Sequence, residues 1–421
     1  MEKIIIEGGL PLHGTIQAGG SKNAALPILA ATLLTPDPCT ISNVPDVSDV
    51  QFMVKILQHL GACVEPLGKN TVRVEARHIR DEAPYDLVRK MRASVCLLGP
   101  LLGRLKSCKV SVPGGCVIGP RPIDLHVEGL NKLGAHFTLE EGNIVSHTHE
   151  LTGAAVDLKS KFGSTVLGTE NLMMAAAVAK GITTIKHAAQ EPEVVDLASF
   201  LNKMGAKISG AGTPTIRIEG VESLHGCEHR VICDRIEAGT FMTAAAITGG
   251  NILVRGCDPV HLHALIERLE KMGLNIHWED NDIRVQVDQP LRSTKVVTEP
   301  YPGFPTDMQA QLMAVMSLAE KTSTVVEKVF PERFMHAAEL VRMGAKIQVS
   351  GDTAHIDGVK HLSGAHVMAS DLRASAALVV AGLAAHGRTT IHRVYHIDRG
   401  YENIDEKLRS LGARVWREKD E

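Results

Sequence analysis

Stretches rich in alanine and other aliphatic residues recur along the chain and alternate with stretches in which apolar and polar positions follow a helical spacing. The first kind is apolar on nearly every side, which predicts helices buried inside a domain. These stretches are 24–34, 93–103, 171–181, 239–250, 308–319 and 374–387. The second kind, such as 54–64 and 265–276, predicts amphipathic helices. β-Branched segments such as 181–185 and 387–391 follow the buried helices and predict strands.

Each amphipathic segment ends in a Leu-Gly or Met-Gly pair, and these pairs are evenly spaced. Successive glycines are 73, 71, 68, 71 and 68 residues apart, at Gly61, Gly134, Gly205, Gly273, Gly344 and Gly412. A glycine directly after a helix suits its C-cap. A period of about seventy residues therefore indicates six copies of one structural unit.

The order of elements within a unit predicts an α/β fold. Each unit is expected to contain a strand, a buried helix, a strand, an amphipathic helix and two further strands, and six units would make two domains of three. The sixth unit stops after 411–415 without its last strand, and 3–9 resemble that strand. We therefore expect one domain at 22–232 and a second at 1–21 plus 233–421, with a crossover near 228–235.

Composition excludes several classes of protein. The net charge of −3 argues against a general nucleic-acid binder, for which a basic face would be expected. No apolar run is long enough to span a bilayer, and the first residues are interrupted by glycine too early to be a signal peptide. The eight cysteines lack CxxC spacing, so reduced thiols in the cytoplasm are expected, with no membrane association.

Charged and polar residues gather just before the helices of each unit. Before the buried helices these are Lys22, Asn23, Arg92, Thr169, Glu170, Asn171, Arg235, Glu237, Asp307, Asp371 and Arg373; before the amphipathic helices they are Asp46, Asp49, 116–121, 191–196, Asp258, Arg333, Asp398 and Arg399. Free N–H groups at helix starts attract anions, and arginine binds phosphate and carboxylate in bidentate fashion. The pattern favours an anionic ligand, although a single residue of this kind is usually a cap or a surface ion pair.

Two other motifs carry less information. The sequence around Lys22 lacks the Gly-Lys-Ser/Thr of a phosphate-binding P-loop. His261 and His263 have metal-ligand spacing, but no third ligand is close in sequence, so a surface helix explains them and no metal is predicted.

The segment 112–122 has a different character. It holds three glycines and three prolines, so neither a helix nor a central strand is expected there. Cys116 lies at its centre, with Arg121 five residues further on. An exposed, adaptable loop with a thiol near a cation favours a reactive cysteine over a buried one.

The whole chain resembles the UDP-N-acetylglucosamine 1-carboxyvinyltransferases, which act early in peptidoglycan synthesis. The segments that carry the resemblance are SKNAALPILAATLL, RASVCLLGPLLGR, PGGCVIGPRPIDLH, EPEVVD, DRIEAGTF, FPTDMQAQ, RFMHAAELVRMGA, DLRASAALVVAGL and HIDRGYENIDEKL, in this order. The resemblance implies two inside-out α/β barrels of three units each. It also implies phosphoenolpyruvate and UDP-N-acetylglucosamine as substrates, a cytoplasmic transferase, and no cofactor or nucleic-acid partner.

The resemblance also implies roles for individual residues. Lys22, with Asn23 beside it, would hold the phosphate of phosphoenolpyruvate. Cys116 would donate a proton to the vinyl carbon or aid turnover, and it would be the thiol that fosfomycin alkylates. Asp307 would be the base near the sugar hydroxyl. The other implied contacts are Arg121 and Arg399 to phosphate, Arg373 and Arg399 to carboxylate, Arg333 and Asp371 lining the site, and Arg92, Arg121, Pro122, Ile123, Asp124, Leu125, Ser164, Thr165, Val166 and Val329 around the nucleotide-sugar.

Two other functions remain alternatives at this stage. One is 3-phosphoshikimate 1-carboxyvinyltransferase, which shares the fold but is not expected to have the PGGC loop or the RPIDLH segment, both present here. The other is a repeat scaffold that binds a nucleotide-sugar without catalysis. The joint presence of Lys22, Cys116, Asp307 and Arg399 argues against the scaffold.

Overall fold

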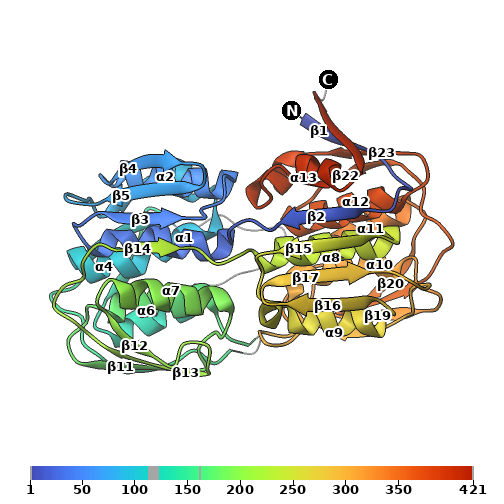
Figure 1. Ribbon diagram of the computed structural model, residues 1–421. Coiled ribbons are helices and arrows are strands. Elements are labelled where there is room, and N and C mark those ends of the chain that lie inside the picture. The colour runs from blue at the N-terminus through green and yellow to red at the C-terminus, as the bar shows by residue number, and fades with distance from the viewer. Residues whose placement is uncertain (1, 112–122, 161–162, 420–421) are drawn as a thin grey trace. The chain divides into compact units, whose positions relative to one another are not determined.

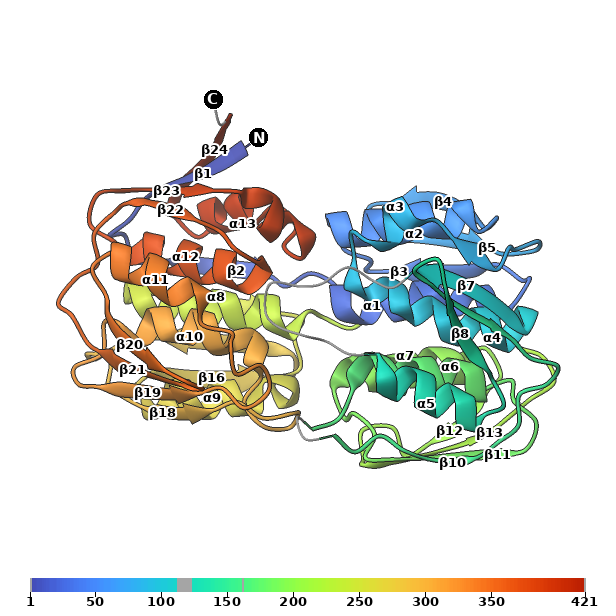
Figure 2. The same cartoon turned by 180° about the vertical axis from the view of Figure 1, so that it is seen from behind.

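The computed structural model describes residues 2–111, 123–160 and 163–419, which form two compact units (Figures 1 and 2). Unit 1 contains residues 2–19 and 233–419, and unit 2 contains the described residues from 20 to 232. Each unit has a hydrophobic core of its own.

The elements of unit 2 repeat one order three times. They are α1 (Lys22–Ala31), η1 (Thr32–Leu34), β3 (Cys39–Ser42), α2 (Ser48–His59), β4 (Cys63–Gly68), β5 (Thr71–Glu75), β6 (Glu82–Ala83), α3 (Tyr85–Val88), η2 (Arg92–Leu97), α4 (Leu98–Leu105), β7 (Ser107–Ser111), α5 (Asp124–Lys132), β8 (Phe137–Glu140), β9 (Asn143–His147), β10 (Ala155–Asp157), α6 (Val166–Ala176), β11 (Ile182–Lys186), α7 (Pro192–Lys203), β12 (Lys207–Ser209), β13 (Thr215–Glu219) and β14 (Glu228–Arg230).

Unit 1 repeats the same order. Its elements are β1 (Glu2–Glu7), β2 (His13–Gln17), α8 (Arg235–Thr248), β15 (Asn251–Arg255), η3 (Pro259–Leu262), α9 (His263–Lys271), β16 (Asn275–Glu279), β17 (Asp282–Gln286), β18 (Lys295–Val297), η4 (Thr306–Met308), α10 (Gln309–Met316), β19 (Ser323–Val326), α11 (Met335–Arg342), β20 (Lys346–Ser350), β21 (Thr353–Asp357), β22 (His366–Met368), α12 (Leu372–Ala384), β23 (Arg388–His392), η5 (Val394–Arg399), α13 (Ile404–Ser410) and β24 (Arg414–Lys419).

The described strands form six four-stranded sheets with one shared topology. In β10-β11-β13-β12, for example, the first pair is parallel and the next two pairs are antiparallel, and the other five sheets repeat this arrangement. Each unit therefore holds three separate sheets rather than one closed sheet. The six-fold repeat and the α/β class predicted from the sequence are confirmed.

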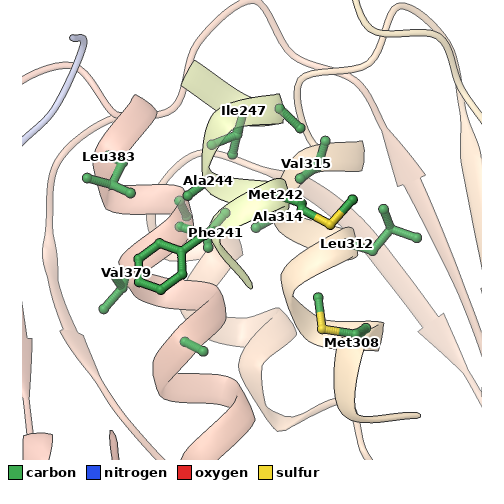
Figure 3. Packing of buried hydrophobic residues seen from close by; sticks show 14 of the residues in the cluster. Phe241, Met242, Ala244, Ile247, Met308, Leu312, Ala314, Val315, Val379 and Leu383 are labelled. Atoms are coloured by element: carbon green, nitrogen blue, oxygen red, sulfur yellow. The ribbon is translucent and has the colours of Figure 1, made fainter. Parts of the chain in front are cut away.

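The Ala-rich helices lie in the interior of each unit, with the sheets outside them. In unit 1, α8, α10 and α12 pack together through aliphatic side chains and Phe241 (Figure 3). Phe241, Leu312 and Val379, one from each helix, are at most 1% exposed. The small alanines let these helices approach closely, which explains a core with so few aromatic residues. This is the inside-out arrangement that the family resemblance implied.

The predicted glycine caps are confirmed at every repeat. All six glycines have positive φ, between 94° and 103°, in the left-handed region that glycine adopts without steric cost.

The helix predicted at 93–103 is interrupted, which corrects the sequence prediction. Residues 92–97 form the 3₁₀ helix η2, and only from Leu98 does an α-helix follow. The side chain of Asn171 explains the change, because its Nδ2 donates to the Val95 carbonyl and its Oδ1 accepts from the Gly99 amide, both at 2.8 Å. These are the two backbone groups that would bond each other in an α-helix. Pro100 has no N–H to offer the next carbonyl.

The leading strands of the first and fourth repeats are exchanged between sheets. β2 precedes α1 in the chain but pairs with β15, whereas β14 precedes α8 but pairs with β3. β1 lies between β23 and β24 in unit 1. The chain passes from one unit to the other at 19–20 and at 232–233.

Candidate active site

In unit 1, Asp307 lies between two arginines. Nη1 of Arg333 is 2.8 Å from its Oδ1, and Nη2 of Arg373 is 2.9 Å from its Oδ2. Asp307 comes from η4, Arg333 from the turn before α11 and Arg373 from the first turn of α12. Both arginines are buried, and Asp307 is partly exposed. The repeat thus brings together three charged groups that are far apart in sequence, each beside the start of a helix.

The charge state of Asp307 follows from this contact. Burial alone would raise the pKa of its carboxyl, but the positive charges of Arg373 and Arg333 outweigh that effect and hold the pKa well below its ordinary value. Asp307 is therefore an anion throughout the physiological pH range. A carboxylate in this state is a weak base until at least one of the arginines turns to another anion.

The buried carboxylate of Glu327 is linked to the Asp307 site through hydrogen bonds. Glu327 accepts hydrogen bonds from the hydroxyls of Thr298 and Thr306, at 2.6 and 2.9 Å. It also accepts from the backbone amides of Val329 and Phe330, at 3.0 and 2.9 Å. Thr306 in turn accepts from Arg333 at 3.1 Å. Glu327 therefore fixes both the turn that carries Val329 and the orientation of Arg333.

Asp371 caps α12. Its side chain accepts from the backbone amides of Arg373 and Ala374 at 2.9 and 3.1 Å, and Ser375 donates to its carbonyl. Since a cap stabilises a helix start by about 1 kcal/mol, Asp371 supports the element that carries Arg373.

Arg399 ends η5 in unit 1 and is partly buried. The neighbouring Asp398 is held by Arg417 of β24, with contacts of 2.7 and 3.1 Å, and Arg417 also contacts Asp405 at 3.0 Å. This bidentate contact attaches the segment that carries Arg399 to the sheet.

In unit 2, Lys22 forms an ion pair with Asp49. The sequence pattern had included Asp49 but had not predicted this pairing. Lys22 begins α1, Ser21 caps the helix, and Nζ of Lys22 lies 3.0 Å from Oδ2 of Asp49 in α2. The lysine is 9% exposed and Asp49 is 2% exposed. Asn23 follows on the same helix and is partly buried. The ammonium group is therefore held near the helix start, where an anion is favoured.

Arg92 begins η2, close to a buried imidazole. Burial, helped by the charge of Arg92, lowers the pKa of His126 to about 4, so His126 is neutral at pH 7. Its Nδ1 lies 3.0 Å from Nδ2 of Asn171 and must accept that hydrogen bond, because the amide nitrogen can only donate. Leu125 and His126 lie on α5, which begins at Asp124 directly after Ile123.

Thr165 caps α6, where its hydroxyl accepts from the Gly168 amide at 3.2 Å, and Ser164 and Val166 lie beside it. Glu170 on the same helix is fully buried, and its Oε1 has no hydrogen-bond partner. Burial, with Glu193 and Glu191 nearby, raises the pKa of Glu170 well above its ordinary value. Glu170 is therefore held as the neutral acid.

Three of the predicted site residues, Cys116, Arg121 and Pro122, lie outside the described residues. Among the described ones, no three potential ligands lie close enough together to hold a metal ion. His261 lies 3.9 Å from Asp258.

In the described parts of the chain, no helix is long and apolar enough to cross a membrane.

Comparisons with known proteins cover nearly the full chain. The sequence profile of EPSP synthase (3-phosphoshikimate 1-carboxyvinyltransferase) matches residues 6–408. A protein of Methylacidiphilum infernorum named UDP-N-acetylglucosamine 1-carboxyvinyltransferase is 58% identical over 99% of both chains. One of the same name from Akkermansia muciniphila is 54% identical over 100% of both. The chain belongs to the EPSP synthase family and, within it, to the UDP-N-acetylglucosamine 1-carboxyvinyltransferases.

Solved structures share the fold of this chain. The enolpyruvyl transferase NikO from Streptomyces tendae has a TM-score of 0.89 and 27% identity, and the match covers 99% of this chain and 98% of that one. An EPSP synthase from Acinetobacter baumannii has a TM-score of 0.75 at 17% identity, with both chains fully covered, and shows the fold alone.

Sequence reasoning missed several residues of this candidate site. Glu327 and Thr306 act through hydrogen bonds, and neither belongs to the polar pattern before the helices. Tyr401 contacts Arg373 at 3.3 Å. A signal for Tyr401 was available, because a tyrosine in a protein with few aromatic residues usually brings its hydroxyl to a partner when buried.

Proposed function

We propose that this protein transfers the carboxyvinyl group of phosphoenolpyruvate to the 3-hydroxyl of UDP-N-acetylglucosamine and releases phosphate. The observation that carries the proposal is 58% identity over the full chain with a protein named for this reaction. The reaction would take place in the cytoplasm and supply peptidoglycan synthesis. The free thiols among the described cysteines are compatible with a reducing compartment.

The arrangement around Asp307 fits an addition-elimination reaction. The addition step needs a base for the sugar hydroxyl and a proton for the methylene carbon, and the elimination step expels phosphate. Asp307 would be the base. Arg373, which contacts Asp307 in the structure, would turn toward the carboxylate of phosphoenolpyruvate. The pKa of Asp307 would then rise toward its ordinary value, so that the carboxylate becomes a competent base when substrate is bound.

The other site residues would stabilise the charges of phosphoenolpyruvate or contact the nucleotide-sugar. Lys22, Arg121 and Arg399 would stabilise the departing phosphate, and Arg373 and Arg399 would hold the carboxylate. Cys116 would protonate the methylene carbon or aid turnover. Asn23, Arg333 and Asp371 would complete the surroundings. The nucleotide-sugar would contact Arg92, Arg121, Pro122, Ile123, Asp124, Leu125, Ser164, Thr165, Val166 and Val329.

Phosphate release tests the proposal. The protein is incubated with phosphoenolpyruvate together with UDP-N-acetylglucosamine, shikimate 3-phosphate or no acceptor. We expect phosphate to be released only when UDP-N-acetylglucosamine is the acceptor. Release with shikimate 3-phosphate alone would establish the sister reaction, and binding of the nucleotide-sugar without release would establish the non-catalytic scaffold; either result refutes the proposal.

A further inference from the structure

The hydroxyl of Tyr401 lies at the centre of a buried polar cluster in unit 1. It is 2.8 Å from Oγ1 of Thr240, 3.3 Å from Nη1 of Arg373 and 3.4 Å from Nε2 of Gln311. Tyr401 is 2% exposed, and its three partners are at most 3% exposed. The partners come from α8, α12 and α10, the three helices that form the centre of the unit.

The direction of each hydrogen bond follows from the chemistry of the partners. Arg373 and the amide nitrogen of Gln311 can only donate, so the Tyr401 oxygen accepts from both. Thr240 donates its own hydrogen to the Ile236 carbonyl at 2.8 Å. Its oxygen is therefore left to accept the Tyr401 hydrogen. Burial raises the pKa of Tyr401, so the hydroxyl keeps this hydrogen at neutral pH. The Tyr401 oxygen is consequently held as an acceptor facing Arg373.

This acceptor fixes the orientation of the guanidinium that meets Asp307. Arg373 donates through Nη1 to Tyr401 and through Nη2 to Asp307, at 3.3 and 2.9 Å. The guanidinium carbon also lies 5.8 Å from the centre of the Tyr401 ring. When Arg373 turns from Asp307 to an incoming anion, as the proposed function requires, the Tyr401 contact is available to keep Nη1 in place and leave Nη2 to exchange partners.

We propose that Tyr401 is a positioning residue for phosphoenolpyruvate: its hydroxyl holds one side of the Arg373 guanidinium so that the other side can pass from Asp307 to the substrate. The inference rests on the proposed function. It assigns Tyr401 no contact with substrate, so its effect is expected to run entirely through Arg373.

The test compares Tyr401→Phe with wild type. Removal of the hydroxyl leaves a buried Arg373 donor without its acceptor, which should raise the KM for phosphoenolpyruvate roughly 5- to 10-fold. The Kd for UDP-N-acetylglucosamine should stay within about twofold of wild type. Tyr395→Phe, at a tyrosine that is 49% exposed, is the matched control and should leave both constants unchanged.

A double-mutant cycle separates positioning from a merely structural role. In an Arg373→Lys background the Tyr401→Phe change should alter the KM for phosphoenolpyruvate by less than about twofold, because the guanidinium it orients is already gone. If Tyr401→Phe does not fold, Thr240→Val, which removes the acceptor for the Tyr401 hydrogen, should raise the same KM, and Thr240→Ser should restore it.

Three results would overturn the inference. One is a wild-type KM in Tyr401→Phe. Another is a rise in the KM for phosphoenolpyruvate on Tyr401→Phe that is equally large in the wild-type and Arg373→Lys backgrounds. The third is a fall in kcat that follows the folded fraction with KM unchanged, which would mark a structural role. A wild-type protein that releases no phosphate would instead refute the proposed function, and the positioning role with it.

Discussion

Oδ2 of Asp307 accepts a hydrogen bond from Nη2 of Arg373, so the proposed base of the reaction is neutralised by a proposed substrate ligand. The second carboxylate oxygen makes an equivalent contact with Arg333. If Arg373 binds phosphoenolpyruvate as proposed, the substrate would have to compete with this internal carboxylate for the guanidinium. This competition would link anion binding to the activation of Asp307 as the proposed base.

Asp307→Asn keeps the shape of the side chain and removes its charge. We expect kcat to fall by roughly 10²- to 10⁴-fold, the usual contribution of a general base, while the KM for phosphoenolpyruvate does not rise, because the arginines lose their internal competitor. Steady-state kinetics measures both constants. Asp352→Asn, at a partly exposed carboxylate paired with Lys328 at 2.7 Å, is the control and should behave as wild type. A variant of Asp307 with wild-type kcat would exclude it as the base.

Asp49→Asn removes the charge that faces Lys22. Loss of one partner of a buried ion pair leaves an uncompensated charge, so the free energy of unfolding should fall by about 3 kcal/mol. Denaturant titration monitored by circular dichroism measures this change. The double variant Lys22→Gln/Asp49→Asn should recover part of the loss, since neither charge remains. If the double variant is less stable than Asp49→Asn, the ion pair is not the cause.

Glu170→Gln should stabilise the protein increasingly as pH rises. The pKa of Glu170 is raised in the folded protein, so folding requires a proton whenever the pH exceeds the unfolded pKa of about 4.3, and the native state loses stability as pH increases. The neutral amide needs no proton, and its advantage should grow by up to about 1.4 kcal/mol per pH unit. Unfolding at pH 5 and pH 8 measures the difference.

The exposed Glu219 provides the matched control for Glu170. A hydrogen bond from Lys207 lowers the pKa of Glu219, so Glu219→Gln should show no gain at pH 8. An equal gain in both variants would point to net charge rather than to the buried acid.

Fosfomycin should modify Cys116 and leave the buried thiols unmodified. Burial raises the pKa of Cys108 to about 12 and that of Cys96 well above its ordinary value, and thiols are poor nucleophiles compared with thiolates. Mass spectrometry of the intact and digested protein should show one adduct at Cys116, lost in Cys116→Ser. Cys63→Ser, at an exposed cysteine, should keep the adduct. An adduct on Cys116→Ser would contradict the assignment.

The features that could be predicted from the sequence are those that repeat. The glycine after each amphipathic helix is required locally, so its positive φ follows from one short segment. Asp307 and Arg373 could be singled out because each lies near the start of a buried helix at an equivalent place in its repeat. The meeting of these two side chains with Arg333 needed the three-dimensional arrangement, since the distance between them depends on the packing of α10 and α12.

Other features depend on single long-range contacts and could not be predicted. The interruption of the helix at Val95 and Gly99 is caused by Asn171, which is remote in sequence. The support of Arg333 by Glu327 through Thr306 likewise joins separate segments. Such contacts leave no periodic signal in the sequence, because each depends on a single polar side chain and not on regularly spaced residues.

The position of β1 and β2 has a consequence for folding during synthesis. Their partners are β23, β24 and β15, and Glu7 pairs with Arg414. β1 and β2 are made before the described strands of unit 2 and stay without their partners while those strands are synthesised, and β1 waits until β23 and β24 have been made. All the described strands of unit 2 have been made once β14 has emerged. Ile4, Ile5 and Ile6, which are buried in the folded protein, are therefore open to association with other chains until synthesis reaches β23 and β24.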